Sequence, residues 1–311
     1  MPDRTDKSFR LIGMYEMLSR GGGVAKLDLA ERFGVSEKTI QRDIDDLRAY
    51  LAEGRPSESG ASIRYDRARN EYALVRFERE WLTNEEVMAI SKILLESRAF
   101  PKAEASRLMD KLLMQAMPEE RGFIRDMIKS ELFNYVELRH GKNLLPAIWD
   151  LSRMVRGREE ASFSYTRQDG AAGERIAHPV ALIFSEFYFY LIAYLAGGER
   201  DFPAVFRVDR IENIRRTGEK FSVPYHKKFS DGEFRKRVQF MYPGRLERIT
   251  FSFKGDSIEA VLDRLPTAEI VSESDGAYTV TAEVYGRGID MWLRSQGDFV
   301  SSVRRSEVRK S

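Results

Sequence analysis

The chain has 311 residues, 42% of them hydrophobic and 32% charged, with a net charge of +2. This length exceeds the usual size of one hydrophobic core, so two or three domains are expected. The sequence has no uncharged apolar run of the roughly 18 residues that cross a bilayer, and the polar residues 1–8 are not expected to form a signal peptide. The absence of cysteine excludes disulfides, thiolate metal sites and cysteine nucleophiles. We therefore expect a cytoplasmic protein without a membrane partner.

Charge is distributed unevenly along the chain. Residues 1–76 contain 14 Lys or Arg against 13 Asp or Glu, so this region has no general basic excess. Residues 207–248 contain 12 basic and 6 acidic residues. A local excess of this kind attracts anions such as phosphate.

Two short helices are predicted near the amino terminus. Residues 9–18 carry apolar side chains at helical spacing, with Leu11, Tyr15 and Leu18 on the expected buried side and Ile12 and Met14 beside them. Three glycines at 21–23 are expected to end this helix. Residues 26–33 form the second helix, which is expected to bury Leu29, Ala30 and Phe33.

A glycine turn leads to a third helix. Gly34 suits the positive φ that follows a helix, and Ser36 is a good N-cap. The expected buried stripe comprises Ile40, Ile44, Leu47 and Leu51, and the exposed face carries Glu37, Lys38, Thr39, Gln41, Arg42 and Asp45. A polar-faced third helix after such a turn is the arrangement that enters a major groove. A small helical bundle with a solvated face is the alternative.

Residues 29–44 resemble the DeoR-type helix-turn-helix over both helices and the turn. The resemblance implies that the third helix reads operator DNA. Residues 62–75 alternate in polarity around a polar turn that includes Asn70, which predicts a β-hairpin and hence the wing of a winged helix-turn-helix. Two roles remain open for the arginines of the wing: contact with DNA phosphates, or exposure to solvent as ordinary turn residues. The expected DNA-binding residues are Ser36, Lys38, Thr39, Gln41, Arg42, Arg67 and Arg69.

Residues 77–156 are predicted to form a helical connector that also serves dimerisation. Thr83 and the following acidic residues are a helix start signal, and Pro101 and Pro118 divide the stretch into about three helices. A last helix over 142–156 is expected to turn Leu145, Ile148, Trp149 and Met154 inward. We interpret four methionines of this stretch as core-packing residues: Met109, Met114, Met117 and Met127.

Residues 157–225 change to the period of a β-sheet. The expected strands are 161–167, 175–184, 187–196, 204–208 and 214–221, and five short strands in so few residues predict a small SH3/Sm-like β-barrel.

This stretch resembles the WYL domain of bacterial transcriptional regulators. The resemblance runs from Trp149 to Pro224 and rests on residues 163–165, 178–179, 189–191 and 206–211. Phe189 stands where the family has tryptophan, so an aromatic packing role is kept and the indole N–H is lost. The family implies that the barrel senses an anionic effector, a nucleotide or single-stranded nucleic acid.

The effector site is carried over from the family residue by residue. Arginine offers forked donors to phosphate and tyrosine offers stacking faces to bases. The alternatives are that the arginines pair with neighbouring acids, that Tyr190 belongs to the core and that His178 is an ordinary satisfied histidine. The candidates are Ser164, Tyr165, His178, Tyr190, Arg207 and Arg210.

Residues 226–311 begin with a basic, mostly irregular link over 226–237. The order β-α-β-β-α-β that follows predicts a small ferredoxin-like domain. It resembles the short carboxy-terminal (WCX-like) extension that follows WYL domains, which implies a role in dimerisation or regulation. The whole chain is thus predicted to be multidomain α+β.

No sequence motif indicates catalysis. The nucleophile elbow, the phosphate-binding loop and the zinc-protease motif are missing from the sequence, and Gly286-x-Gly288 lacks a third glycine and a Rossmann context. We expect no enzyme activity, no metal and no cofactor. The predicted function is a ligand-responsive, sequence-specific transcriptional regulator, with repression favoured, that acts as a homodimer on double-stranded operator DNA. The alternative is an RNA-binding or scaffolding protein that uses the Sm-like barrel.

Overall fold

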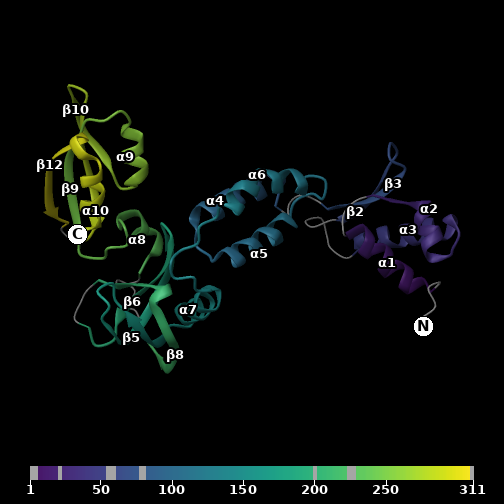
Figure 1. Ribbon diagram of the computed structural model, residues 1–311, viewed down its shortest axis with the longest axis horizontal. Coiled ribbons are helices and arrows are strands. Elements are labelled where there is room, and N and C mark those ends of the chain that lie inside the picture. Colours follow the sequence, from purple (N-terminus) through teal and green to yellow (C-terminus); the bar gives the residue numbers. More distant parts are fainter. Residues whose placement is uncertain are drawn as a thin grey trace. The chain divides into compact units, whose positions relative to one another are not determined.

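The computed structural model describes residues 6–19, 23–53, 61–76, 82–198, 202–222 and 229–308. The chain divides into two compact units, Met1–Glu137 and Leu138–Ser311. Each unit mixes helices with strands (Figure 1), in agreement with the predicted α+β class. Gly21 and Gly22, which were expected to end the first helix, lie outside the described residues.

Three helices and a small sheet begin the first unit. The helices are α1 (Lys7–Ser19), α2 (Lys26–Phe33) and α3 (Glu37–Glu53). The sheet has the order β1-β3-β2, from β1 (Val24–Ala25), β2 (Ala61–Asp66) and β3 (Glu71–Arg76). Gly34 has φ of 66° at the end of α2, as its position predicted. The predicted helices and hairpin are confirmed.

The buried face of α1 differs from the predicted one. Met14 and Leu18 are fully buried, whereas Tyr15 is 39% and Ile12 69% exposed. The helix is rotated because Arg10 is also buried, and Arg10, Met14 and Leu18 repeat every fourth residue along one side. Because Arg10 is charged, the apolar spacing did not mark this side of the helix as the buried one.

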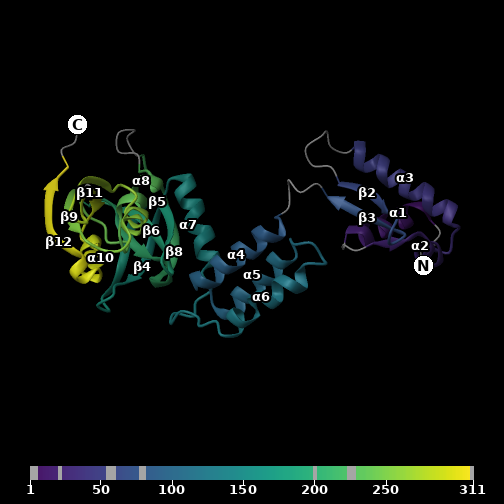
Figure 2. The same ribbon diagram turned by 90° about the horizontal axis from the view of Figure 1, so that it is seen from above.

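The helices α4 (Asn84–Ser97), α5 (Lys102–Leu113) and α6 (Arg121–Phe133) lie side by side in both views (Figures 1 and 2). Thr83 caps α4 in a reciprocal capping box with Glu86, which confirms the predicted start. The buried residues that α4, α5 and α6 contribute include Val87, Leu95, Met109, Leu113, Ile124 and Ile128.

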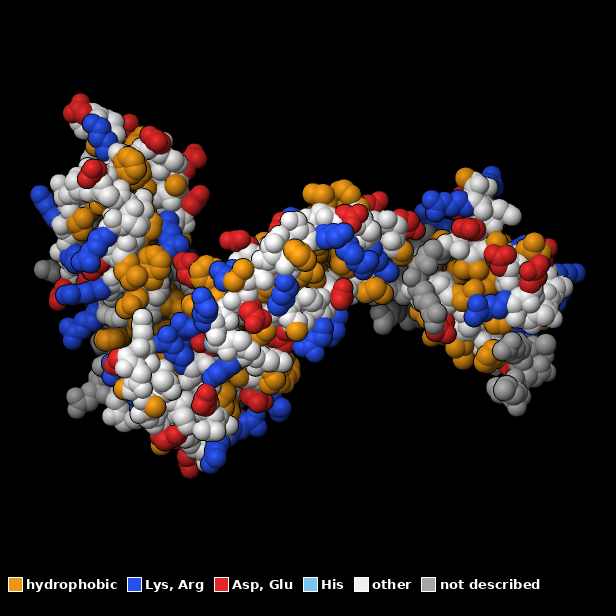
Figure 3. All heavy atoms as spheres, viewed as in Figure 1, with side chains coloured by type: hydrophobic (Ala, Val, Ile, Leu, Met, Phe, Trp, Pro, Cys, Tyr) orange, Lys and Arg blue, Asp and Glu red, His pale blue; other side chains and the backbone are white. Residues whose placement is uncertain are grey.

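Three of the four methionines assigned to this core are exposed. Met109 is buried, but Met114 and Met117 are each 59% exposed and Met127 is 50% exposed. Met114 and Met117 follow the end of α5, and Met127 lies beside the buried Ile124–Ile128 stripe of α6 and not on it. Hydrophobic side chains are therefore visible on the surface of these helices (Figure 3).

The helix α7 (Leu145–Gly157) packs against a sheet in the second unit. It buries Leu151 and Met154, and Ile148 is partly buried against the same core. The prediction was wrong for Trp149, which is 66% exposed, and for Leu145, which is 38% exposed. Only a narrow stripe of this helix meets the sheet, so both side chains fall outside it.

The sheet has five antiparallel strands in the order β7-β6-β5-β4-β8. All five predicted strands are present, and β8 begins three residues earlier than residue 214, the predicted start. The edge strands β7 and β8 do not pair with each other, so the sheet is open and the predicted closure into a barrel is not seen among the described residues. The strands are β4 (Glu159–Thr166), β5 (Ala172–Ser185), β6 (Tyr188–Leu195), β7 (Ala204–Arg207) and β8 (Ile211–Lys220), with a 3₁₀ turn η1 (Val208–Arg210) before β8.

The link expected to be irregular contains a helix, α8 (Asp231–Arg237). Ser230 caps it, and Phe234 is buried against Ala181 and Ile183 of β5. The helix forms because one apolar side chain among seven residues finds this surface, a contact that its local sequence does not reveal.

A four-stranded antiparallel sheet in the order β10-β11-β9-β12 follows. Two helices, α9 (Ile258–Arg264) and α10 (Gly288–Ser295), contribute Val261 and Trp292 to its core. The strands are β9 (Leu246–Phe253), β10 (Glu269–Ser274), β11 (Ala277–Tyr285) and β12 (Val300–Glu307). The element order is the predicted β-α-β-β-α-β.

Gly286 and Gly288 serve close backbone packing. Gly286 has φ of 62°, and a Cβ on Gly288 would lie 1.9 Å from the carbonyl oxygen of Gln239. Only glycine fits here, so this pair holds the segment 239–244 against the end of β11.

Candidate nucleic-acid interface and candidate effector site

The helix α3 is held in place by a buried ion pair with α1. The Nε of Arg10 lies 2.8 Å from Oδ2 of Asp43, and the two side chains are only 7% and 3% exposed. A second, exposed pair joins Lys7 to Asp46 at 2.7 Å. Because a buried charge is costly without its partner, the first pair fixes the rotation of α3 about its axis. Apolar spacing gave no signal for this pair.

The first two turns of α3 present Lys38 and Arg42 to solvent. Neither side chain has a hydrogen-bond or ion-pair partner among the described residues. Ser36 and Thr39 are occupied instead, because the Ser36 oxygen accepts from the Thr39 N–H at 3.2 Å and the two hydroxyls lie 3.0 Å apart. The predicted N-cap is thus confirmed, and Lys38 and Arg42 are the cations of the first two turns without a partner among the described residues.

Gln41 is bound within the protein. Its Oε1 accepts a 2.8 Å hydrogen bond from the hydroxyl of Tyr72 on β3, and its Nε2 donates to Asp45 at 3.2 Å. Asp45 also accepts from Arg48, which donates to the carbonyl oxygen of Ile63 on β2. The half-buried Gln41 amide therefore joins α3 to the hairpin, and it must exchange these bonds to contact a base.

The hairpin turn carries Arg67 and Arg69, both exposed and without a side-chain partner among the described residues. The turn is ordered by Asp66, whose carboxylate accepts from the backbone N–H groups of Ala68 and Arg69 at 2.8 and 3.2 Å. Asn70 has φ of 56°, which closes the turn. Both guanidinium groups are thus available to an external anion.

In the second unit, Arg207 is the centre of a compact cluster. Its Nε and Nη2 donate to the two oxygens of the buried Asp209 at 3.0 and 2.8 Å. Its guanidinium carbon lies 3.4 Å from the centre of the Tyr188 ring, and its backbone N–H donates to the Tyr165 hydroxyl at 3.3 Å. Tyr190 is the register partner of Arg207 in the neighbouring strand.

Burial and the charge of Asp209 together set the ionisation of this cluster. Burial raises the pKa of Tyr190 to about 12, against the opposing charge of Arg207. Burial would by itself lower the pKa of Arg207, but the hydrogen bonds and charge of Asp209 outweigh it, so the Arg207 pKa is raised. Both groups keep their protonated forms at neutral pH, and the positive charge of Arg207 is already balanced by Asp209.

Ser164 and His178 lie apart from this cluster. The Ser164 hydroxyl donates to Glu174 at 2.6 Å, and His178 Nε2 lies 2.9 Å from a Glu160 oxygen with its ring stacked on Phe221. Neighbouring residues of a strand point to opposite faces, so Ser164 and Tyr165 cannot share one site. Among the six candidates, the contacts of the described residues join Tyr165 and Tyr190 to Arg207.

Arg210 lies in the 3₁₀ turn, half-buried, with no side-chain partner among the described residues. Tyr188 and Asp209 are the contacts that the sequence prediction did not include in the site. Tyr188 alternates with Tyr190 along β6, and the period-two rule could have indicated that both face Arg207.

Among the described residues, no group of three or more His, Asp or Glu side chains is arranged to hold a metal ion. Within the same residues, no helix is long and apolar enough to span a membrane.

Comparison with known families gives two matches. Residues 10–54 match an HTH domain, and residues 146–216 match the WYL domain. The chain thus contains an HTH domain followed by a WYL domain, and it resembles WYL-domain transcriptional regulators. The WYL match includes α7, in agreement with the packing of this helix on the sheet.

A curated relative is the "Uncharacterized HTH-type transcriptional regulator YobV" of Bacillus subtilis (strain 168), 26% identical over 187 residues. The match covers 60% of this chain and 58% of the relative, so it spans little more than half of either protein.

Two solved structures show weak likeness. The proteasome accessory factor B/C (PafBC) of Arthrobacter aurescens is 17% identical with a TM-score of 0.29, over 97% of this chain and 44% of that one. A CRISPR Cas-related protein is 10% identical with a TM-score of 0.33, over 85% of this chain and 67% of that one. Neither score establishes a common overall fold.

Proposed function

We propose that the chain is a sequence-specific transcriptional regulator that binds operator DNA through residues 1–76. The observation that carries this proposal is the helix α3, which the buried Arg10–Asp43 pair orients. Its first two turns present Lys38 and Arg42, which have no partner among the described residues. Such side chains suit base edges and phosphates of a major groove. The curated relative, which is named as an HTH-type transcriptional regulator, supports the same function.

We propose the following division of the chain. Residues 1–76 form a winged helix-turn-helix, and the helices that follow form the connector, which the sequence alone ended at residue 156. The packing of α7 favours an earlier boundary, near residue 138. An SH3/Sm-like sensor domain to about residue 225 and a ferredoxin-like, WCX-like domain over 226–311 complete the chain. The strand orders β7-β6-β5-β4-β8 and β10-β11-β9-β12 support the last two assignments.

The regulator acts as a homodimer on an inverted repeat. The exposed hydrophobic side chains of the connector, among them Ile93, Met114, Met117 and Phe133, offer apolar surface for pairing. Two half-sites add affinity that a single winged domain lacks. Footprinting should protect two half-sites separated by about one or two helical turns. A monomer in solution that protects a single half-site would contradict this.

The WYL domain senses an anionic effector, a nucleotide or single-stranded nucleic acid, at Arg207 and Arg210. Arg210 has no partner among the described residues, and Tyr188 and Tyr190 lie beside Arg207. Because Asp209 already occupies the fork of Arg207, the effector first engages Arg210 and competes with Asp209 only afterwards. Repression is the mode that we propose, since a dimer on promoter DNA obstructs polymerase. The setting is the cytoplasm, and no catalytic step is assigned.

The test is a competition between duplex DNA and RNA. Operator sequences are selected from random duplexes with the full chain, and affinity is measured against the selected duplex, a scrambled duplex and RNA of the same sequence. We expect the selected duplex to bind about 10³-fold or more tightly than the scrambled one, and Lys38→Ala/Arg42→Ala to remove this difference. Equal or tighter binding of RNA would support the RNA-binding alternative and overturn the proposal.

A further inference from the structure

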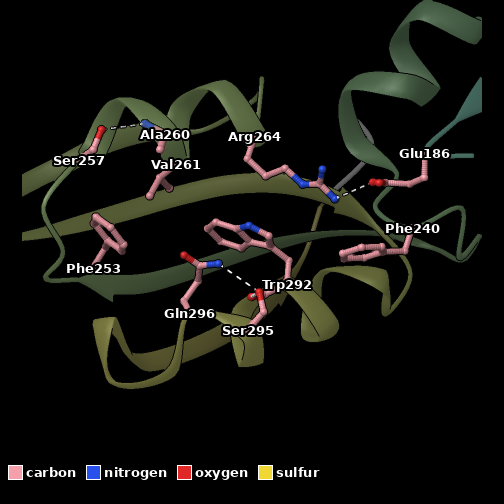
Figure 4. A pocket seen from close by; sticks show the side chains of 10 residues that line it. All are labelled: Glu186, Phe240, Phe253, Ser257, Ala260, Val261, Arg264, Trp292, Ser295 and Gln296. Carbon is pink, nitrogen blue, oxygen red and sulfur yellow. Dashed lines mark hydrogen bonds and ion pairs between the residues drawn. The ribbon is translucent and has the colours of Figure 1, made fainter. Parts of the chain in front are cut away.

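A cavity of about 470 Å³ lies where α9 and α10 meet the turn between β5 and β6 (Figure 4). The indole of Trp292 lies between the rings of Phe253 and Phe240, with Arg264 on one side and Gln296 on the other (Figure 4). Its size is that of cavities that take small organic ligands, which run from about 300 to 1,000 Å³. Three aromatic walls favour a flat aromatic ring.

Arg264, the cation of this cavity, has a hydrogen-bond partner among the described residues at only one of the two atoms of its fork. Nη2 of Arg264 lies 3.2 Å from Oε1 of Glu186, whereas its Nε is buried without a hydrogen-bond partner among the described residues. The Nε and Nη2 atoms of arginine form one fork that fits the two oxygens of a carboxylate. Arg207 has this complete arrangement, with both fork atoms bound to Asp209. Glu186, in contrast, supplies a single oxygen to Arg264 and leaves half of the fork unsatisfied.

The aromatic wall beside Arg264 is built into the fold. Phe240 and Met241 are two successive residues with positive φ, 49° and 54°, a conformation that costs energy in residues other than glycine. The tight packing of Gln239 on Gly288 holds this segment in place. The guanidinium carbon of Arg264 lies 5.0 Å from the centre of the Phe240 ring, so cation and ring already form one surface.

We propose that this cavity binds a small aromatic carboxylic acid. The ring of the acid lies against Trp292 between Phe240 and Phe253. Its carboxylate displaces Glu186 and occupies both fork atoms of Arg264, which satisfies the Nε that Glu186 leaves without a partner. The exchange releases Glu186 from Arg264 at the β5–β6 turn, two residues before Tyr188, whose ring stacks on Arg207. This site is separate from the proposed nucleotide site and does not depend on DNA binding.

The test is calorimetric titration of the full chain, without DNA, with 1-naphthylacetate and with its uncharged amide, 1-naphthylacetamide. We expect the acid to bind at least about tenfold more tightly than the amide, because only the acid forms a charge-assisted fork. Arg264→Lys keeps the positive charge and loses the two-pronged donor. It should therefore weaken binding of the acid by about tenfold and leave the affinity for the amide unchanged. Arg294→Lys, at an exposed arginine of α10, is the matched control and should bind as the wild type does.

Glu186→Gln provides a second, opposite readout. It removes the competing carboxylate from an exposed turn and should therefore raise the affinity for the acid by about threefold or more. A variant with a damaged fold would not bind the acid more tightly. Three results would each overturn the proposal. They are equal affinity of the wild type for acid and amide, unchanged affinity of Arg264→Lys for the acid, and weaker binding of the acid by Glu186→Gln. Loss of binding in Arg207→Lys but not in Arg264→Lys would place the acid at the other arginine and overturn it as well. None of these outcomes bears on operator binding, so the proposed function is tested independently.

Discussion

The hydroxyl of Tyr72 on the hairpin donates a 2.8 Å hydrogen bond to the side-chain oxygen of Gln41 on α3. This bond joins the proposed wing to the proposed recognition helix. It also removes one acceptor from the face that was expected to read bases. In the proposed DNA interface, the hairpin therefore acts through α3 as well as through its own arginines.

Tyr72→Phe should lower the free energy of unfolding by about 1 kcal/mol, because one hydrogen bond is lost while the ring stays packed. The released Gln41 amide should change the base preferred at one operator position, which selection from random duplexes measures. Tyr65→Phe is the control, since the Tyr65 hydroxyl donates to Asn70 of the same hairpin. If Tyr72→Phe selects the same operator sequence as the wild type, this bond has no influence on recognition.

Arg42→Ala should weaken operator binding by about 1–3 kcal/mol, the usual contribution of a base contact. Its thermal stability should not change, because the side chain is exposed without a partner among the described residues. Gln41→Ala should lower stability by about 1 kcal/mol, since Tyr72 loses its acceptor. Gel-shift titration and calorimetric unfolding separate the two effects, and full operator affinity in Arg42→Ala would remove it from the interface.

Asp43→Asn should destabilise the first unit by about 3 kcal/mol, because the buried guanidinium of Arg10 loses the charge of Asp43. Asp46→Asn breaks the exposed pair with Lys7 and should have no measurable effect. Denaturant unfolding of both variants gives the comparison. If the two substitutions cost the same, the buried pair is not what orients α3.

The stability of the connector should depend on pH through Glu104. This carboxylate is buried on α5 with no hydrogen-bond partner for either oxygen among the described residues, and burial raises its pKa above 4.5, with Arg107 opposing. A raised folded-state pKa means that the folded state binds the proton more tightly. The stabilisation is thus fully present below pH 4.5 and is lost as pH rises through the folded-state pKa.

Glu104→Gln should remove this dependence. It should raise the melting temperature relative to the wild type at neutral pH and not below pH 4.5, where the wild-type side chain is also uncharged. Melting curves from pH 4 to pH 8 measure the difference. Glu119→Gln, at an exposed position, should follow the wild type at every pH. Parallel curves for Glu104→Gln and wild type would contradict the assignment.

Arg210→Glu should abolish the response of operator affinity to nucleotides or short single strands, a coupling of about 1–3 kcal/mol, and leave basal operator binding intact. Arg207→Glu should instead lower stability, because it faces the buried Asp209 with a second carboxylate. Affinities are compared with and without effector at fixed salt, since phosphate contacts are strongly screened. A wild type that never responds would leave the sheet with a structural or dimerisation role.

Short-range patterns in the sequence determined which elements form. Gly34 and Ser36 marked the turn and the start of α3, Thr83 and Glu86 marked the start of α4, and alternation located five strands in the second unit. These signals were sufficient because caps, turns and periodicity depend on residues within one or two turns of the chain. The HTH and WYL domains that the family comparisons match were located by the resemblance of residues 29–44 and of Trp149 to Pro224 to those families.

Only the tertiary structure decided how these elements face one another and which polar groups are free. The side chains of Arg10 and Asp43 meet across 33 positions, and those of Gln41 and Tyr72 across 31. Whether a charge is buried depends on a partner that local sequence cannot specify, which is why α1 is rotated from its predicted face. Contacts between distant segments therefore selected the cations that remain available to a ligand.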